Sequence, residues 1–205
     1  MFRLATFLFV LMVLPVFGRP AEAQTYYLEL DAGYGQSLDA SLATSGAGFG
    51  KAGFAAAPAA GIAFGFASHD GWRLEAALDW NRAEFDTVGG AAAVGEIEAM
   101  GAMFNIIYGV STGTPVTPWL GAGGGAARVA VSGLTTPGGV VDGFDTVPAW
   151  QALAGVDVAF SESVTLVVTG RYFAADSVRI DDPAGTRLGF DLHGASAMLG
   201  LRFGF

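Results

Sequence analysis

Apolar residues alternate one by one with polar or small residues along much of the chain. In residues 72–81 one set of alternate positions is apolar and mostly large. That set is Trp72, Leu74, Ala76, Leu78 and Trp80, and between them lie Arg73, Glu75, Ala77, Asp79 and Asn81. A period of two is typical of a β-strand whose two faces meet different surroundings. The pattern predicts eight strands, at about 26–35, 59–67, 72–81, 96–110, 119–129, 149–160, 165–173 and 195–205.

The connections between these segments alternate between short and long. Short, turn-like stretches lie at 68–71, 111–117 and 161–163, and longer ones at 36–58, 83–95, 130–147 and 174–191. Antiparallel strands of about ten residues joined in this way are typical of outer-membrane barrels. Eight strands closed into a ring leave no unpaired backbone edge, as lipid requires. We therefore predict an all-β, eight-stranded antiparallel transmembrane up-and-down β-barrel of outer-membrane type, with short periplasmic turns and long external loops.

The alternative is a water-soluble eight-stranded barrel, which would carry its apolar set inside. Here the apolar set holds large residues such as Trp80 and Trp150, whereas the charged set is padded with glycine and alanine. That arrangement suits a crowded interior and a wider outer surface. The polar exceptions in the apolar set are Arg82, Glu98, Arg128 and His193, all on the long-loop side of their strands. Near the interface a charge costs only about 0–1 kcal/mol, so the apolar set is predicted to face lipid.

The first residues resemble an export signal. A positively charged start at Met1–Arg3 precedes an apolar run from Leu4 to Phe17, and Ala21-Glu22-Ala23 offers small residues for cleavage. The run is shorter than the roughly 20 residues of a spanning helix. We predict a cleaved signal peptide at residues 1–23 and an outer-membrane β-barrel domain at 24–205. The alternative is an uncleaved N-terminal anchor.

The composition excludes several classes of protein. Charged residues make up 14% of the 205 residues, against about 25% in ordinary soluble domains. The net charge of −9 argues against a nucleic-acid partner. The absence of cysteine excludes disulfides, thiolate metal sites and catalytic thiols. Because no metal-ligand cluster stands out either, we predict no cofactor and no metal.

Charged residues of both signs occupy the predicted inward positions. They are Glu29, Asp31, Arg73, Glu75, Asp79, Asp157, Arg171 and Arg202. We expect an ion-pair and hydrogen-bond network that fills a space too narrow for a channel. Since the last strand lies beside the first in a closed barrel, Arg202 should lie near Glu29 or Asp31. The alternative is a gated narrow pore, in which five acids against three bases would favour cations.

The chain ends on Gly200-Leu201-Arg202-Phe203-Gly204-Phe205, which resembles the final-strand signal of bacterial outer-membrane proteins, although Met198 stands where a polar residue is usual. Residues 117–125 and 150–157 are similar to strands of small OmpA-like or opacity-type outer-membrane β-barrels of Gram-negative bacteria. The resemblance implies a place in the outer membrane. It also implies recognition of Gly200, Phe203 and Phe205 by the barrel assembly machinery.

No catalytic arrangement emerges from the sequence. Some outer-membrane barrels modify lipid A with a paired histidine and serine, but His193 and Ser196 are three residues apart on a strand and therefore face opposite sides. We predict a monomer that is not an enzyme and has a structural or surface-contact role. A narrow porin and a lipid A-modifying enzyme are the alternatives. Expected partners are outer-membrane lipids, lipopolysaccharide phosphates at Arg82 and Arg128, and an external ligand or host surface contacted by the long loops.

Overall fold

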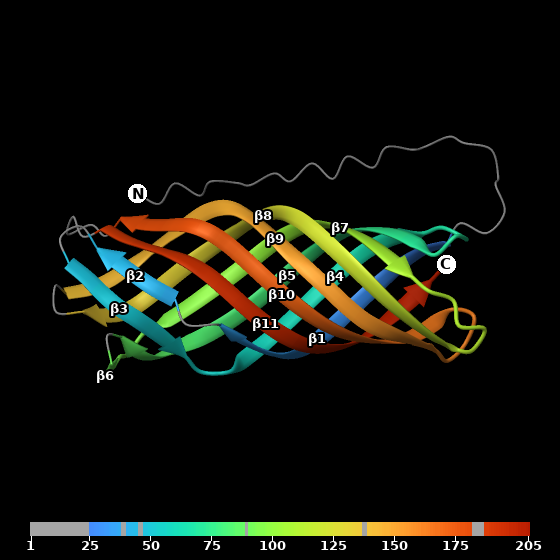
Figure 1. Cartoon of the computed structure of the whole chain (residues 1–205), viewed down its shortest axis with the longest axis horizontal. Helices are drawn as coiled ribbons and strands as arrows, with labels where there is room; N and C mark the ends of the chain where they lie inside the picture. Colours follow the sequence, from blue (N-terminus) through green and yellow to red (C-terminus); the bar gives the residue numbers. More distant parts are fainter. Residues whose placement is uncertain (1–24, 38–39, 45–46, 89, 137–138, 182–186) are drawn as a thin grey trace, which may run out of the picture.

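The computed structural model describes residues 25–37, 40–44, 47–88, 90–136, 139–181 and 187–205, which form an elongated barrel (Figure 1). Among these residues, eight long strands make the wall. They are β1 (Thr25–Ser37), β4 (Ala57–Ala67), β5 (Trp72–Val88), β7 (Glu96–Gly109), β8 (Val116–Thr136), β9 (Gly139–Ala159), β10 (Val164–Asp181) and β11 (Arg187–Gly204). In this part of the chain, no helix has the length and apolar character needed to cross a membrane.

Each wall strand pairs antiparallel with the wall strand that follows it in the chain. The ring closes because β11 pairs with β1, from Tyr27 opposite Gly204 to Ser37 opposite Gly194. The fold class and all eight predicted strand segments are confirmed. The chain's end lies at the same end of the barrel as the short turns, which we call the inner end (Figure 1).

The alternation of the sequence becomes an alternation of faces. In β7, Met103 and Ile107 point inward and are each 2% exposed, whereas Phe104 between them is 69% exposed. Leu120 in β8 and Trp72 in β5 are likewise on the outer face, at 70% and 52% exposure. These exposed apolar side chains form a band around the barrel, which we call the membrane band. They are the side chains expected to meet lipid.

The structure corrects the prediction of long external loops. Most of residues 83–95, 130–147 and 174–191 belong to β5, β8, β9, β10 and β11, which run well past the predicted membrane band. Farther along these strands the polarity of the two faces inverts, and β-bulges interrupt the alternation between Val131 and Leu134 and between Ala175 and Val178. In β8, Val129 and Val131 point inward and are buried, and Arg128 and Ser132 point outward. The sequence prediction recognised a strand by its apolar outer face, and the outer ends of these strands lack that face.

The first predicted loop, residues 36–58, also extends the wall. It contains β2 (Ala40–Thr44) and β3 (Ala47–Phe54), which pair with each other. β2 pairs with β11, and β3 pairs with β5, so the hairpin takes the place of β1 and β4 beyond their ends. A short strand, β6 (Ala91–Ala92), pairs with the end of β5. We call this extension, at the end opposite the short turns, the outer section of the barrel.

The outer section is filled by an apolar core. Its larger buried members are Phe54, Phe85, Ile97, Val129, Val131, Leu134, Val141, Val147, Phe173, Val178, Ile180, Leu188, Phe190 and Leu192. These side chains come from strands on all sides of the ring, so they meet across its axis. The outer section therefore has the organisation of a water-soluble barrel, with apolar residues inside and charged residues outside.

Residues 1–23, for which we predict a cleaved signal peptide, lie outside the described residues. The peptide and its cleavage stay predictions.

The inverted polarity can be tested with one carboxylate placed on either face of β8. Val131→Asp puts an unpaired charge into the apolar core, and we expect it to lower the free energy of unfolding by about 3 kcal/mol or more. Ser132→Asp puts the same group on the exposed face, where about 0.5 kcal/mol is the expected limit. Both losses of free energy are measured by urea unfolding of the refolded protein, with the folded fraction read from heat-modifiable gel migration. Equal losses for the two variants would contradict the assignment of faces.

Candidate functional site

The structure places all eight predicted interior charges inside the barrel, on β1, β5, β9, β10 and β11. Their side chains are about nine-tenths buried wherever they form ion pairs. They lie between the inner end and the apolar core of the outer section. Glycines leave room for them: a Cβ at Gly61 would collide with the Asp31 carboxylate, and one at Gly65 with the Tyr27 ring.

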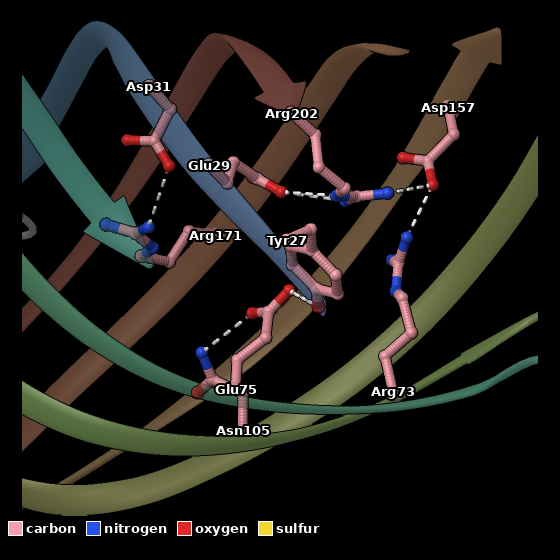
Figure 2. A network of polar contacts seen from close by, with 9 residues as sticks. All are labelled: Tyr27, Glu29, Asp31, Arg73, Glu75, Asn105, Asp157, Arg171 and Arg202. Atoms are coloured by element: carbon pink, nitrogen blue, oxygen red, sulfur yellow. Dashed lines mark hydrogen bonds and ion pairs between the residues drawn. The ribbon is translucent and has the colours of Figure 1, made fainter. Parts of the chain in front are cut away.

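Asp157 joins two arginines from opposite sides of the barrel. Its Oδ2 accepts from Nη1 of Arg73 and from Nη1 of Arg202, each at 2.5 Å. Arg202 also reaches Glu29 Oε2 through Nε and Nη2, both at 2.8 Å (Figure 2). Charge-assisted contacts of this kind are among the strongest hydrogen bonds in proteins. Glu29 and Arg202 sit directly opposite each other on β1 and β11.

Glu75 is held by neutral donors. Tyr27 donates its hydroxyl proton to Glu75 Oε1 at 2.6 Å, and Asn105 Nδ2 donates to Oε2 at 3.3 Å (Figure 2). Gln151 in turn donates to Asn105 Oδ1 at 2.8 Å. No role was predicted for these three residues from the sequence. A signal was available for two of them, since Asn105 and Gln151 are polar positions between apolar neighbours of their inward sets.

Arg171 forms the third part of the network. Its guanidinium lies 2.8 Å from Asp79 Oδ1 and 3.7 Å from Asp31 Oδ2. The other two arginines also contact aromatic rings, because Arg73 lies over Trp119 at 5.1 Å and Arg202 over Tyr27 at 4.9 Å. Ring faces attract cations more strongly where water is excluded. Every interior arginine is thus paired with at least one carboxylate.

The two predicted lipopolysaccharide-binding arginines face outward at the base of the outer section. Arg82 already forms an ion pair with Glu96 at 2.5 Å. Arg128 instead lies over the ring of Phe144 at 4.1 Å, and within the described ranges it forms no ion pair. The two side chains therefore differ in how free their charge is to meet a ligand.

His193 has partners that the sequence did not suggest. Its Nδ1 lies 2.8 Å from the hydroxyl of Tyr172, and its Nε2 lies 3.7 Å from Asp176 Oδ1. Trp150 packs on the Tyr172 ring at 5.5 Å. Ser196 belongs to the inward set, on the opposite side of β11 from His193. The two residues of the candidate acyl-transfer pair are therefore on different faces of the wall.

The residues of the predicted assembly signal lie on the last strand. Gly200 faces inward against Asp31, whereas Phe203 and Phe205 face outward. Phe205 is near Phe64, with ring centroids 6.4 Å apart, and Phe64 stacks on Tyr26 at 6.0 Å. Aromatic residues gathered at one end of the apolar band are typical of a membrane interface.

Comparisons with known proteins agree on the fold. A family model described as surface antigen matches residues 76–182, just over half of the chain. Among solved structures, Neisserial surface protein A is 23% identical, with a TM-score of 0.56, over 90% of this chain and 100% of that one. The outer membrane protein OprG of Pseudomonas aeruginosa is 16% identical, with a TM-score of 0.60, over 87% and 95%. No curated protein sequence matches the chain.

The branched ion pair at Asp157 can be tested by removing its charge. Asp157→Asn leaves Arg73 and Arg202 without their shared carboxylate, and we expect a loss of about 3 kcal/mol in the free energy of unfolding. Glu84→Gln, which changes an exposed outward residue, is the matched control. The double variant Arg73→Gln/Asp157→Asn should lose less than the sum of its two single changes. Simple additivity in urea unfolding would argue against the pair.

Proposed function

This chain belongs to the surface antigen family of small outer-membrane β-barrel proteins, and from that membership we propose a barrel closed to solutes whose function lies in its outer surface. The chain is exported, residues 1–23 are removed, and the apolar band places it in the outer membrane. Its outer section then stands beyond the membrane as a rigid surface for contact with an external ligand or a host surface. The barrel acts as a monomer and catalyses no reaction.

The observation that carries this proposal is that the interior is filled in two different ways. In the membrane band, ion pairs link strands across the axis, as Arg73 and Asp157 do between β5 and β9. In the outer section the apolar core occupies the axis, with Val131, Leu134 and Ile180 at most 1% exposed. An ion that followed the axis would have to break the network and then cross a dry apolar layer. Both steps oppose conduction.

The strands that extend the outer section also support a contact role. Their outward faces carry charged residues such as Glu84, Asp86 and Arg179, as a water-exposed surface should. Backbone pairing continues almost to the hairpin ends, for example from Thr136 to Gly139 between β8 and β9. A paired hairpin presents its side chains with less loss of conformational entropy on binding than a mobile loop does.

A narrow cation porin is the second candidate, and the excess of carboxylates over arginines in the interior favours it. A lipid A-modifying enzyme is the third, and His193 with Tyr172 and Asp176 is the cluster it would use. Among the described residues, the polar partners of its imidazole are Tyr172 and Asp176, and neither is a serine. We therefore rank catalysis last. Mass spectrometry of lipid A from cells that express the protein tests it, because unchanged acyl chains are expected.

Planar bilayer recordings separate the closed barrel from the porin. The refolded protein should give no stepwise conductance in 1 M KCl, because both parts of its interior are filled. Arg73→Glu should also remain closed, since the apolar core is untouched by that change. Steady conductance of the unaltered protein, with a cation selectivity that Arg73→Glu alters, would establish the porin instead.

Within the proposed surface, Arg128 is the better candidate for binding lipopolysaccharide phosphate. Its charge has no carboxylate partner among the described residues, whereas Arg82 is paired with Glu96. A charge-assisted hydrogen bond contributes about 1.5–3 kcal/mol, so Arg128→Gln should weaken binding about tenfold or more. Arg82→Gln should have a smaller effect. Calorimetric titration of purified lipopolysaccharide into the unaltered protein and into each variant measures these affinities. Equal affinities of Arg128→Gln and the unaltered protein would exclude Arg128 as a phosphate ligand.

A further inference from the structure

A small cavity, which we call the side cavity, lies at the base of the outer section. It lies where β1 and β4 end, and its volume is about 30 Å³. Its lining includes Trp80 and Ala195 from the outward set and Asp79, Arg171 and Phe173 from the inward set. Most of its lining residues are at inward positions, so the cavity belongs to the interior beside the wall.

A second cavity, of about 20 Å³, lies within the polar network. Asp79 and Arg171 line both cavities, so their ion pair lies between the side cavity and this second one. Each cavity has room for about one or two water molecules. Both cavities lie below the apolar core that fills the axis of the outer section.

The charges around this ion pair do not balance. Asp31 and Asp79 share Arg171, and these three groups together carry one unmatched negative charge. Asp79 Oδ1 lies 2.8 Å from a nitrogen of Arg171, but neither oxygen of the Asp79 carboxylate has a hydrogen bond of good geometry within the described residues. The Asp79 side chain is nine-tenths buried. An unmatched buried carboxylate is costly unless a positive charge joins it.

We propose that the side cavity is a binding site for a small monovalent cation such as Na⁺, K⁺ or ammonium, with Asp79 as its anionic ligand. The cavity is lined by further oxygen-bearing side chains from Ser37, Asn81 and Ser196, and hard cations take oxygen ligands. One unmatched negative charge calls for one positive charge. The described residues contain no group of three carboxylate, histidine or cysteine ligands of the kind that holds a divalent metal.

The site goes beyond the proposed function and does not depend on it. The positive charge of Arg82, which also lines the cavity, is offset by Glu96. The cation would complete the buried network and hold the ends of β1 and β4 against β5 and β11, whose residues line the same cavity.

Unfolding in different salts tests the site. The midpoint of urea unfolding is measured for the full barrel in zwitterionic detergent, in NaCl, KCl or NH₄Cl, with choline chloride keeping the ionic strength constant. Once the free concentration of the cation exceeds its dissociation constant, each further tenfold increase in that concentration should raise the ratio of folded to unfolded protein tenfold. Asp79→Asn should abolish this rise, and Glu84→Gln should leave it intact.

A second readout covers the case in which Asp79→Asn does not fold. Trp80 lines the cavity, so its fluorescence in the otherwise unaltered protein should change saturably with the cation. The change should be missing in Trp80→Phe. A midpoint and a Trp80 signal that are the same in choline chloride and in all three salts would overturn the proposal. So would a midpoint that depends on pH but not on the cation, because a proton would then balance the charge. Neither result affects the conductance test of the closed barrel.

Discussion

The constraint on which this structure depends is that lipid offers no hydrogen bonds to a backbone. Every N–H and C=O in the membrane band must therefore find its partner within the protein, and the pairing of β11 with β1 closes the ring that achieves this. A closed ring in turn fixes which residues point in and which point out. Side chains therefore point into or out of the wall both in the membrane band and in the outer section.

The same strands are expected to lie partly in lipid and partly in water, and the composition of their two faces is opposite in the two parts. In the membrane band the outer face is apolar and the interior carries paired charges, such as Arg202 with Glu29 and Asp157. In the outer section the outer face is charged and the interior is apolar. Side chains fill the interior of a narrow barrel along its whole length. Here the filling changes from paired charges to apolar side chains at the level where the outer face changes from apolar to charged. The proposal of a closed barrel rests on this filling.

The sequence predicted what depends on local alternation. The eight strands, their faces and the inward position of all eight charged residues follow from a period of two, and Arg202 beside Glu29 follows from ring closure. The length of the outer section could not be predicted in this way, because Val129 and Val131 continue the alternation with inverted polarity and no longer resemble a membrane strand. A β-bulge then shifts the inward position to Leu134. The contact of Arg73 with Asp157 depends on strand stagger across the barrel, which alternation does not encode. Asp176 reaches His193 beside a β-bulge between Ala175 and Val178, with Ser177 at a φ of 61°.

The central claim is that the same strands carry two opposite polarities along their length, and site-directed spin labelling tests it most directly. The chain has no cysteine, so each introduced cysteine carries the only label. Labels at Leu120, Ala122 and Ala126 in β8 should be accessible to oxygen dissolved in lipid, and labels at Arg128, Ala130 and Ser132 to a water-soluble nickel reagent. A label at Val131 should be shielded from both. Lipid-type accessibility at Ser132, or water-type accessibility at Val131, would contradict the account.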